Sequence, residues 1–250
     1  MNIRKKIVII GANSAIAKEC ARIWSANTSV DFLLVGRNTV ELERLALDLH
    51  ARSPKCAVLV VAANFLDPVQ ISNFIDGIFT SGSVDITLIA HGFLPDQLIC
   101  QESLESVNEA LQINGVSPLL FAEGFAKNMS KSGKGNLAII SSVAGDRGRK
   151  SNYVYGSAKA MINTYVQGLQ HRFAASPINI SVIKPGPTDT PMTKHLKMQG
   201  INLASVDSVA KVIVEGIEKG RPVIYAPQKW RWIMAVIQHM PTFIFNKLNI

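Results

Sequence analysis

A tyrosine and a lysine separated by one helical turn are the residues of this chain best suited to do chemistry. Tyr155 and Lys159 stand in the segment Tyr153-Val-Tyr-Gly-Ser-Ala-Lys-Ala160, and an α-helix places residues i and i+4 on one face. A neighbouring ammonium group favours the phenolate and lowers the tyrosine pKa, which makes the phenol a proton donor near neutral pH. Ser142 precedes Tyr155 by thirteen residues, and its hydroxyl is a candidate to hold a substrate carbonyl against that phenol.

Short apolar runs rich in β-branched residues alternate with helical patterns along most of the chain. The runs predict buried strands at Ile7–Ile10, Phe32–Val35, Ala57–Ala62, Ile86–Ala90, Asn136–Ser141, Asn179–Ile183 and Val223–Tyr225. Helices are predicted near Ala15–Trp24, Val40–Ala51, Val69–Phe79, Ser103–Met129, Val154–Phe173 and Val206–Lys219. Such alternation is typical of a parallel sheet covered on both faces. The predicted fold class is α/β, and we expect residues 1–250 to form a single domain.

Composition narrows the class of protein further. The chain has 250 residues, 48% of them hydrophobic and 18% charged, which suits one sizeable core. Neither a secretion signal nor the roughly 18–20 apolar residues of a membrane span is found. Three cysteines, Cys20, Cys56 and Cys100, argue against a disulfide framework and a metal site and fit the cytoplasm. The net charge of +8 suggests an anionic partner, although no aromatic-interleaved basic motif indicates nucleic acid.

The first two predicted strands are each followed by a candidate nucleotide-binding feature. The first leads into Gly11-Ala-Asn-Ser-Ala-Ile-Ala17, where a tight turn would direct helix N-terminal amides at a pyrophosphate. Alanines at two of the usual glycine positions make a plain strand–turn–helix an equally good interpretation of this motif alone. After the second strand, Gly36 replaces the carboxylate that would bind a ribose hydroxyl, and Arg37 could meet a 2′-phosphate. This pattern favours NADP(H) over NAD(H). The alternative is that Arg37 is only a solvated surface residue.

Taken together, these motifs and their order resemble the short-chain dehydrogenase/reductase family over essentially the whole chain. The shared features are Gly-x-x-x-Ala-x-Ala after the first strand, Asn114, Ser142, Tyr155 with Lys159, and Pro185-Gly186. The resemblance implies a Rossmann-type, doubly wound fold and nicotinamide-dependent carbonyl or alcohol chemistry. It implies that Tyr155 donates the proton, that Lys159 lowers its pKa and holds the nicotinamide ribose, and that Ser142 orients the substrate carbonyl. Asn114 would support a water that links the lysine to solvent.

The resemblance also implies a set of cofactor contacts. These are Gly11, Asn13, Ser14, Ala15, Ile16, Arg37, Asn64, Phe65, Ala90, His91, Gly92, Tyr155, Lys159, Pro185, Gly186, Thr188 and Thr190. Two departures from the family pattern occur here. The usual Asn-Asn-Ala-Gly is Ile89-Ala-His-Gly92, and Asn64 replaces an aspartate expected near the adenine. His91 replaces a small residue near the nicotinamide ribose, so packing and substrate contact are both open for it.

A closer likeness covers the second half of the chain. The segments Gly145–Lys159, Met192–Lys197 and Ala226–Leu248 resemble the reductase component of decaprenyl-phosphoryl-ribose 2′-epimerase. The resemblance implies reduction of a polyprenyl-phosphate-linked keto-sugar, made by a separate flavin-dependent oxidase, in cell-envelope or surface polysaccharide synthesis. One alternative is a broad carbonyl reductase or alcohol dehydrogenase acting on small soluble substrates. Another is a non-catalytic dinucleotide-binding regulator, against which the complete set of reacting groups argues.

Two basic clusters and an apolar tail bear on the substrate. The clusters comprise Arg147, Arg149 and Lys150 after the Ser142 strand, and Lys194, His195 and Lys197 after Pro185-Gly186. On one rim they would suit a substrate phosphate, the alternative being two solvated loops. Residues 228–250 predict an apolar helical tail that is too short to span a bilayer. We expect the tail to contact either the inner membrane face or an oxidase there, or a neighbouring subunit of a homo-oligomer.

Overall fold

Seven parallel strands form the centre of the molecule. The computed structural model describes residues 4–27, 29–194, 198 and 200–248. The strands are β1 (Lys5–Ile10), β2 (Val30–Gly36), β3 (Val58–Ala62), β4 (Ile86–Ile89), β5 (Gly135–Ile140), β6 (Ile178–Pro185) and β7 (Val223–Ala226). Their order in the sheet is β3-β2-β1-β4-β5-β6-β7, which confirms the predicted doubly wound fold class. The strand order reverses between β1 and β4, and ligands of such sheets bind at the carboxyl ends of the strands beside this point.

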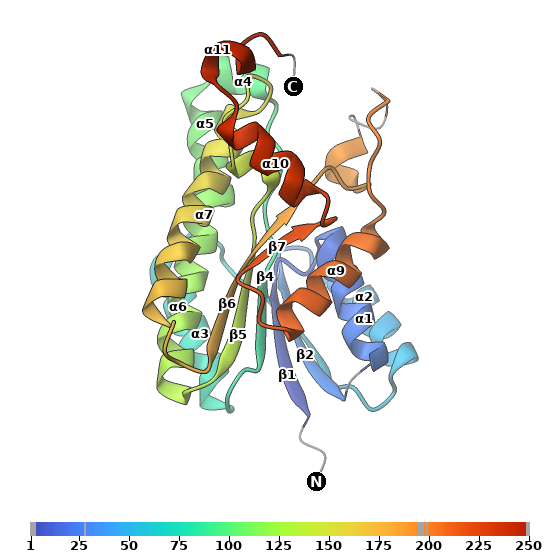
Figure 1. The fold of residues 1–250 in the computed structure, drawn as a ribbon. Helices are drawn as coiled ribbons and strands as arrows, with labels where there is room; N and C mark the ends of the chain where they lie inside the picture. The colour runs from blue at the N-terminus through green and yellow to red at the C-terminus, as the bar shows by residue number, and fades with distance from the viewer. Residues whose placement is uncertain (1–3, 28, 195–197, 199, 249–250) are drawn as a thin grey trace.

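Helices cover both faces of the sheet, as Figure 1 shows. One layer consists of α1 (Ala15–Asn27), α2 (Thr39–Arg52) and α9 (Val206–Glu218), and the other of α3 (Pro68–Thr80), α6 (Ser117–Ser132) and α7 (Tyr153–Arg172). Strand β1 illustrates why both faces are apolar. Ile7 and Ile9 pack into one core with Trp24, whereas Val8 and Ile10 pack into the other core, because successive strand residues point to opposite faces.

The single helix predicted over Ser103–Met129 is wrong. The structure contains α5 (Leu104–Leu111), a π-helical turn η1 (Gln112–Val116) and then α6, and a short helix α4 (Gln97–Glu102) that the pattern did not indicate precedes them. Pro118, near the start of α6, has no N–H to donate to the preceding turn. Within the π turn, the side-chain amide of Asn114 donates to the Ala110 carbonyl at 3.0 Å. Single π turns of this kind are frequent at functional sites.

The predicted apolar tail forms two short helices, α10 (Trp230–His239) and α11 (Thr242–Phe245), separated at Pro241. The Trp230 indole packs against Gly186, where an added Cβ would lie 1.9 Å from its nitrogen. Met234 is fully buried, whereas Trp232 is 71% exposed. The tail is therefore amphipathic, with one face against the body of the protein. Within the described residues, no helix combines the length and the hydropathy needed to cross a bilayer.

Candidate active site

A cavity of about 530 Å³ opens at the carboxyl ends of the strands. All the residues predicted to contact the cofactor line it, together with Ser142 and Arg149. Asn114 lies behind the cavity wall, where its side chain is fully buried. The structure also adds lining residues that the sequence patterns did not single out, among them Phe93, Leu94 and Ile113, and it places Asn152, Met192 and Thr193 in the wall as well.

Ser142 and Tyr155 both line this cavity, and their side chains interact there. Ser142 begins the short 3₁₀ turn η2 (Val143–Gly145), and its extended backbone (φ −166°, ψ 156°) lets its Oγ accept a hydrogen bond from the Ala144 N–H at 3.1 Å. Tyr155 lies in the first turn of α7. Burial raises the pKa of Tyr155 to about 12, while its hydrogen bond with Ser142 opposes that rise. The phenol is therefore protonated at neutral pH.

Lys159 lies one turn further along α7 and is 2% exposed. Its Nζ donates to the Ile140 carbonyl at 3.2 Å and lies 5.6 Å from the centre of the Tyr155 ring. Burial lowers the pKa of Lys159 to about 8. Burial dominates the pKa of Tyr155, which is raised overall, so a lowering of that pKa by the Lys159 cation stays a prediction.

Asn114 occupies the π turn and holds the loop after β4. Its Oδ1 accepts from the Phe93 N–H at 2.8 Å. Gly92, with φ +151°, approaches so closely that an added Cβ would lie 2.7 Å from Asn114 Oδ1 and 3.5 Å from Lys159 Nζ. Only glycine fits this conformation and this spacing without strain. The π turn thus brings a buried amide, a glycine loop and the lysine together, although their positions in the sequence are far apart.

The nucleotide end of the cavity is built from the loops after β1 and β2. Gly11 has φ +81°, and an added Cβ there would lie 2.5 Å from the His91 backbone nitrogen. An added Cβ at Gly36 would lie 2.3 Å from Asn13 Oδ1, and the amide of Asn13 donates to the Asn38 carbonyl at 3.1 Å. A side chain at position 36 would therefore displace the Asn13 amide. The sequence analysis considered Gly36 only as a missing carboxylate. Arg37 follows as an exposed residue at the cavity edge.

His91 lines this cavity and carries a buried hydrogen-bond acceptor that lacks a partner among the described residues. Its Nε2 lies 2.9 Å from the Ser117 hydroxyl, which itself donates to the Phe65 carbonyl. Because the Ser117 hydroxyl donates its proton to Phe65, it must accept the hydrogen bond from His91. This network therefore assigns the imidazole proton to Nε2 and leaves Nδ1 as an acceptor. Nδ1 is buried and has no hydrogen-bond partner among the described residues. Burial lowers the pKa of His91 to about 3, so the ring is neutral, and it packs edge-on to Phe65 with centroids 4.8 Å apart.

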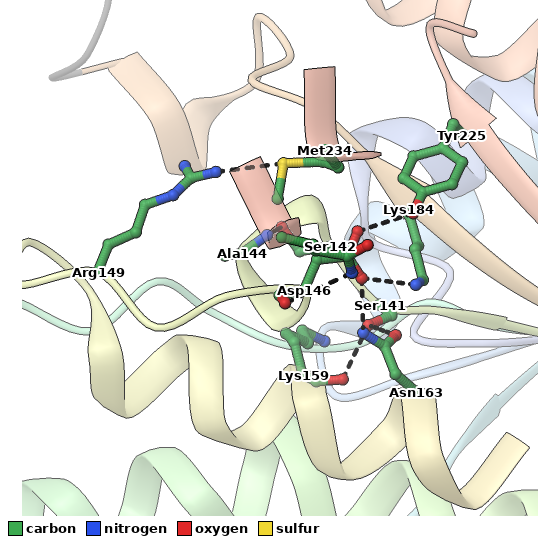
Figure 2. A network of polar contacts seen from close by, with 11 residues as sticks. Ser141, Ser142, Ala144, Asp146, Arg149, Lys159, Asn163, Lys184, Tyr225 and Met234 are labelled. Atoms are coloured by element: carbon green, nitrogen blue, oxygen red, sulfur yellow. Dashed lines mark hydrogen bonds and ion pairs between the residues drawn. The ribbon is translucent and has the colours of Figure 1, made fainter. Parts of the chain in front are cut away.

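A buried polar network lies behind the site, as Figure 2 shows. Asp146 accepts from Lys184 Nζ at 2.6 Å, from the Tyr225 hydroxyl at 2.8 Å and from Asn163 Nδ2 at 3.2 Å. Asn163 Oδ1 accepts in turn from Ser141 Oγ at 2.7 Å. The network joins the residue after β5 with β6, β7 and α7, and Ser141 Oγ also donates to the Lys159 carbonyl at 3.0 Å. The sequence analysis did not identify it, although Lys184, a charged residue beside the predicted buried strand Asn179–Ile183, was a signal that could have been used.

The two predicted basic clusters do not form one rim. The guanidinium of Arg147 donates to the Ile237 and Met240 carbonyls at 2.5 and 2.6 Å, so it caps the end of α10 rather than facing the cavity. Lys150 and Lys194 are exposed and outside the cavity lining. His195 and Lys197 lie outside the described residues. Arg149 is the member of these clusters that the structure places in the cavity wall.

A parallel sheet with this strand order, a cavity at its reversal point, and serine, tyrosine and lysine side chains gathered there together define a dinucleotide-dependent oxidoreductase class. The family model described as short chain dehydrogenase matches residues 5–200. The chain therefore belongs to the short-chain dehydrogenase/reductase family of NAD(P)-dependent oxidoreductases, as predicted.

Relatives and solved structures agree with this family. The chain is 25% identical to an uncharacterized oxidoreductase of Streptomyces coelicolor over 244 residues, covering 98% of this chain and 96% of the relative. An uncharacterized oxidoreductase of Mycobacterium tuberculosis is 25% identical over 245 residues, with coverage of 97% and 96%. A short-chain dehydrogenase from Sphingobium yanoikuyae, solved with NADPH, has a TM-score of 0.82 at 21% identity, with coverage of 98% and 96%. Actinorhodin polyketide ketoreductase, solved with NADPH, has a TM-score of 0.78 at 16% identity, with coverage of 90% and 97%.

Proposed function

We propose that the protein is an NADPH-dependent ketoreductase that reduces a polyprenyl-phosphate-linked keto-sugar for cell-envelope or surface polysaccharide synthesis. The observation that carries this proposal is the composition of one cavity. Tyr155, Lys159 and Ser142 supply carbonyl-reducing chemistry, while two arginines, Arg37 and Arg149, supply positive charge in the same cavity wall. The likeness of the second half of the chain to the reductase of a decaprenyl-phosphoryl-ribose epimerase supports the choice of a lipid-linked sugar.

The nucleotide end fits NADPH. A bound nicotinamide supplies the hydride that reduces a carbonyl carbon. Arg37 would pair with the 2′-phosphate, because Gly36 offers no carboxylate to a 2′-hydroxyl. The N-terminus of α1, beginning at Ala15, would receive the pyrophosphate. The buried Nδ1 of His91 would accept a hydrogen bond from a ribose hydroxyl, which would give this atom the partner that it lacks among the described residues.

The protein's own side chains would handle the proton. The Ser142 hydroxyl would hold the substrate oxygen beside the phenol of Tyr155, which carries a proton at neutral pH because its pKa is raised to about 12. As charge develops on the substrate oxygen, Tyr155 would donate that proton. Lys159, whose pKa burial lowers to about 8, would be mainly cationic at pH 7 and would stabilise the resulting tyrosinate. Asn114 would support the water through which the proton is replaced.

The tail supports a substrate with a lipid chain. Trp232, Val236 and Phe243 are 71%, 66% and 70% exposed, and Lys229 and Arg231 precede Trp232 closely in the sequence. Aromatic and basic side chains on one amphipathic segment suit a membrane interface. We place this face against the inner membrane surface. A separate flavin-dependent oxidase would provide the ketone, and the enzyme would work as a homo-oligomer.

Tyr155→Phe tests the chemistry. Supplied with NADPH and a short-chain polyprenyl-phosphoryl 2-keto-pentose, the natural protein should oxidise NADPH, which is followed as a fall in nicotinamide absorbance. The variant should lose at least about 100-fold in kcat, because general acid catalysis contributes about 10²–10⁴-fold. Nicotinamide fluorescence should show unchanged NADPH binding in this variant, and weaker NADPH binding in Arg37→Ala. Turnover of small neutral ketones with none of the lipid-linked sugar would instead establish a broad carbonyl reductase.

A further inference from the structure

Two residues of one tight turn line the cavity and carry buried polar atoms that lack partners among the described residues. Arg149 Nε and Asn152 Oδ1 are both buried without a hydrogen-bond partner among the described residues, and both residues line the cavity wall. A backbone hydrogen bond from the Asn152 N–H to the Arg149 carbonyl, at 3.1 Å, closes the turn and fixes the two residues relative to each other. Helix α7 begins at the next residue, so this turn immediately precedes Tyr155.

Arg149 is an incompletely compensated cation. Its Nη2 lies 3.4 Å from the Met234 sulfur, which is a weak acceptor, and within the described ranges it forms no salt bridge. Asp146 is the nearest anion that acts on it, but that carboxylate already pairs with Lys184 at 2.6 Å. Burial lowers the pKa of Arg149, and the Asp146 charge opposes this only in part. A desolvated guanidinium is costly unless an anion meets it.

Two comparisons within the chain show that this lack of partners is local. Arg147, two residues earlier, donates to the Ile237 and Met240 carbonyls of the tail. Asn152 precedes α7 at the N-cap position, yet its side chain makes no capping hydrogen bond, although asparagine is among the best residues for that role. Neither residue of the turn is therefore explained by local folding, and buried polar groups of this kind point to a ligand.

We propose that Arg149 and Asn152 form a substrate subsite in which the guanidinium binds the phosphate ester of a sugar and the amide oxygen accepts from a hydroxyl of that sugar. This inference rests on the proposed function and narrows it. The planar fork of arginine matches phosphate oxygens, and its Nε is available to complete a bidentate contact. A small neutral ketone would leave both atoms unsatisfied. Figure 2 shows Arg149 reaching toward Met234 of α10, so the phosphate would lie beside the tail.

The test is a binding measurement that does not require turnover. Isothermal titration calorimetry would compare ribose 1-phosphate with ribose, both in saturating NADP⁺ so that the nucleotide end is filled. Arg149→Gln should weaken ribose 1-phosphate binding by about tenfold to a hundredfold and leave ribose unchanged, because a charge-assisted hydrogen bond is lost. Asn152→Ala should weaken both sugars by about threefold to tenfold. Lys150→Gln, which removes an exposed charge from the same turn, is the matched control and should change neither.

The outcomes separate this subsite from the proposed function. Equal ribose 1-phosphate affinity in Arg149→Gln and the natural protein would overturn the subsite. So would an equal loss in Lys150→Gln, which would indicate a general effect of charge. Arg149→Lys keeps the charge but loses the fork, so partial retention of affinity would support the subsite even if Arg149→Gln folded poorly. Arg149-dependent binding without any keto-sugar turnover would uphold the subsite and reject the proposed function.

Discussion

Replacing Asp146 with asparagine should destabilise the protein far more than removal of a surface charge. The side chains of Asp146 and Lys184 are 1% and 9% exposed, and they meet at 2.6 Å. Breaking a buried pair by removing one partner costs about 3–5 kcal/mol, because the other charge stays buried without compensation. Asparagine keeps an acceptor for the Tyr225 hydroxyl, which contacts Asp146 at 2.8 Å. We therefore expect Asp146→Asn to lower the free energy of unfolding by about 3 kcal/mol, the lower end of that range.

Urea unfolding followed by circular dichroism would measure this loss at one fixed protein concentration. The matched control is Asp207→Asn, which breaks a pair with Lys211 in which the side chains are 55% and 66% exposed. That change should cost far less than Asp146→Asn, because it removes only an exposed ion pair and a charge at the start of a helix. The double variant Asp146→Asn/Lys184→Met should lose less than the sum of its single variants, because it leaves no unpaired charge.

A small loss of unfolding free energy in Asp146→Asn would refute this reasoning. If it cost no more than Asp207→Asn, water or another group would have to compensate Lys184, and the buried pair would not hold the four elements together. If the double variant lost the full sum of the two single changes, the two charges would not be coupled, even though their atoms are in contact.

Two further predictions concern the reacting groups themselves. Because burial lowers the pKa of Lys159 to about 8, kcat/KM for ketone reduction should fall as the pH rises through about 8, where the lysine loses its proton. The variant Lys159→Met should reduce the ketone slowly, and its kcat/KM should not show this fall at high pH. Gly92→Ala should lower both the melting temperature and kcat, because the new Cβ would lie 2.7 Å from the buried Asn114 Oδ1. Gly148→Ala, where nothing lies within 4 Å, should leave both unchanged, and equal losses in the two variants would contradict the packing argument.

Local patterns in the chain carried enough information for the sheet, most of the helices and the family. The strand predicted at Ile7–Ile10 is the end of β1, because a run of apolar residues between turn signals suits a strand buried on both faces. Tyr155 and Lys159 were recognisable because the helical repeat alone brings them to one face. The predicted cofactor contacts, from Gly11 to Thr190, followed from the family resemblance, since family motifs keep a common order along the chain.

Tertiary packing decided the features that depend on contacts between distant segments. The π turn at Asn114 depends on a side-chain hydrogen bond and on the loop at Gly92, so helical periodicity predicted one uninterrupted helix there. Arg147 and Arg149 belong to one basic run, yet the first caps the end of α10 while the second lines the cavity. Nothing in their immediate sequence distinguishes them. The sequence by itself determined which reacting groups the chain carries, through short-range spacing, whereas only the folded tail and sheet decided which cations face the cavity, because charge alone does not specify a partner.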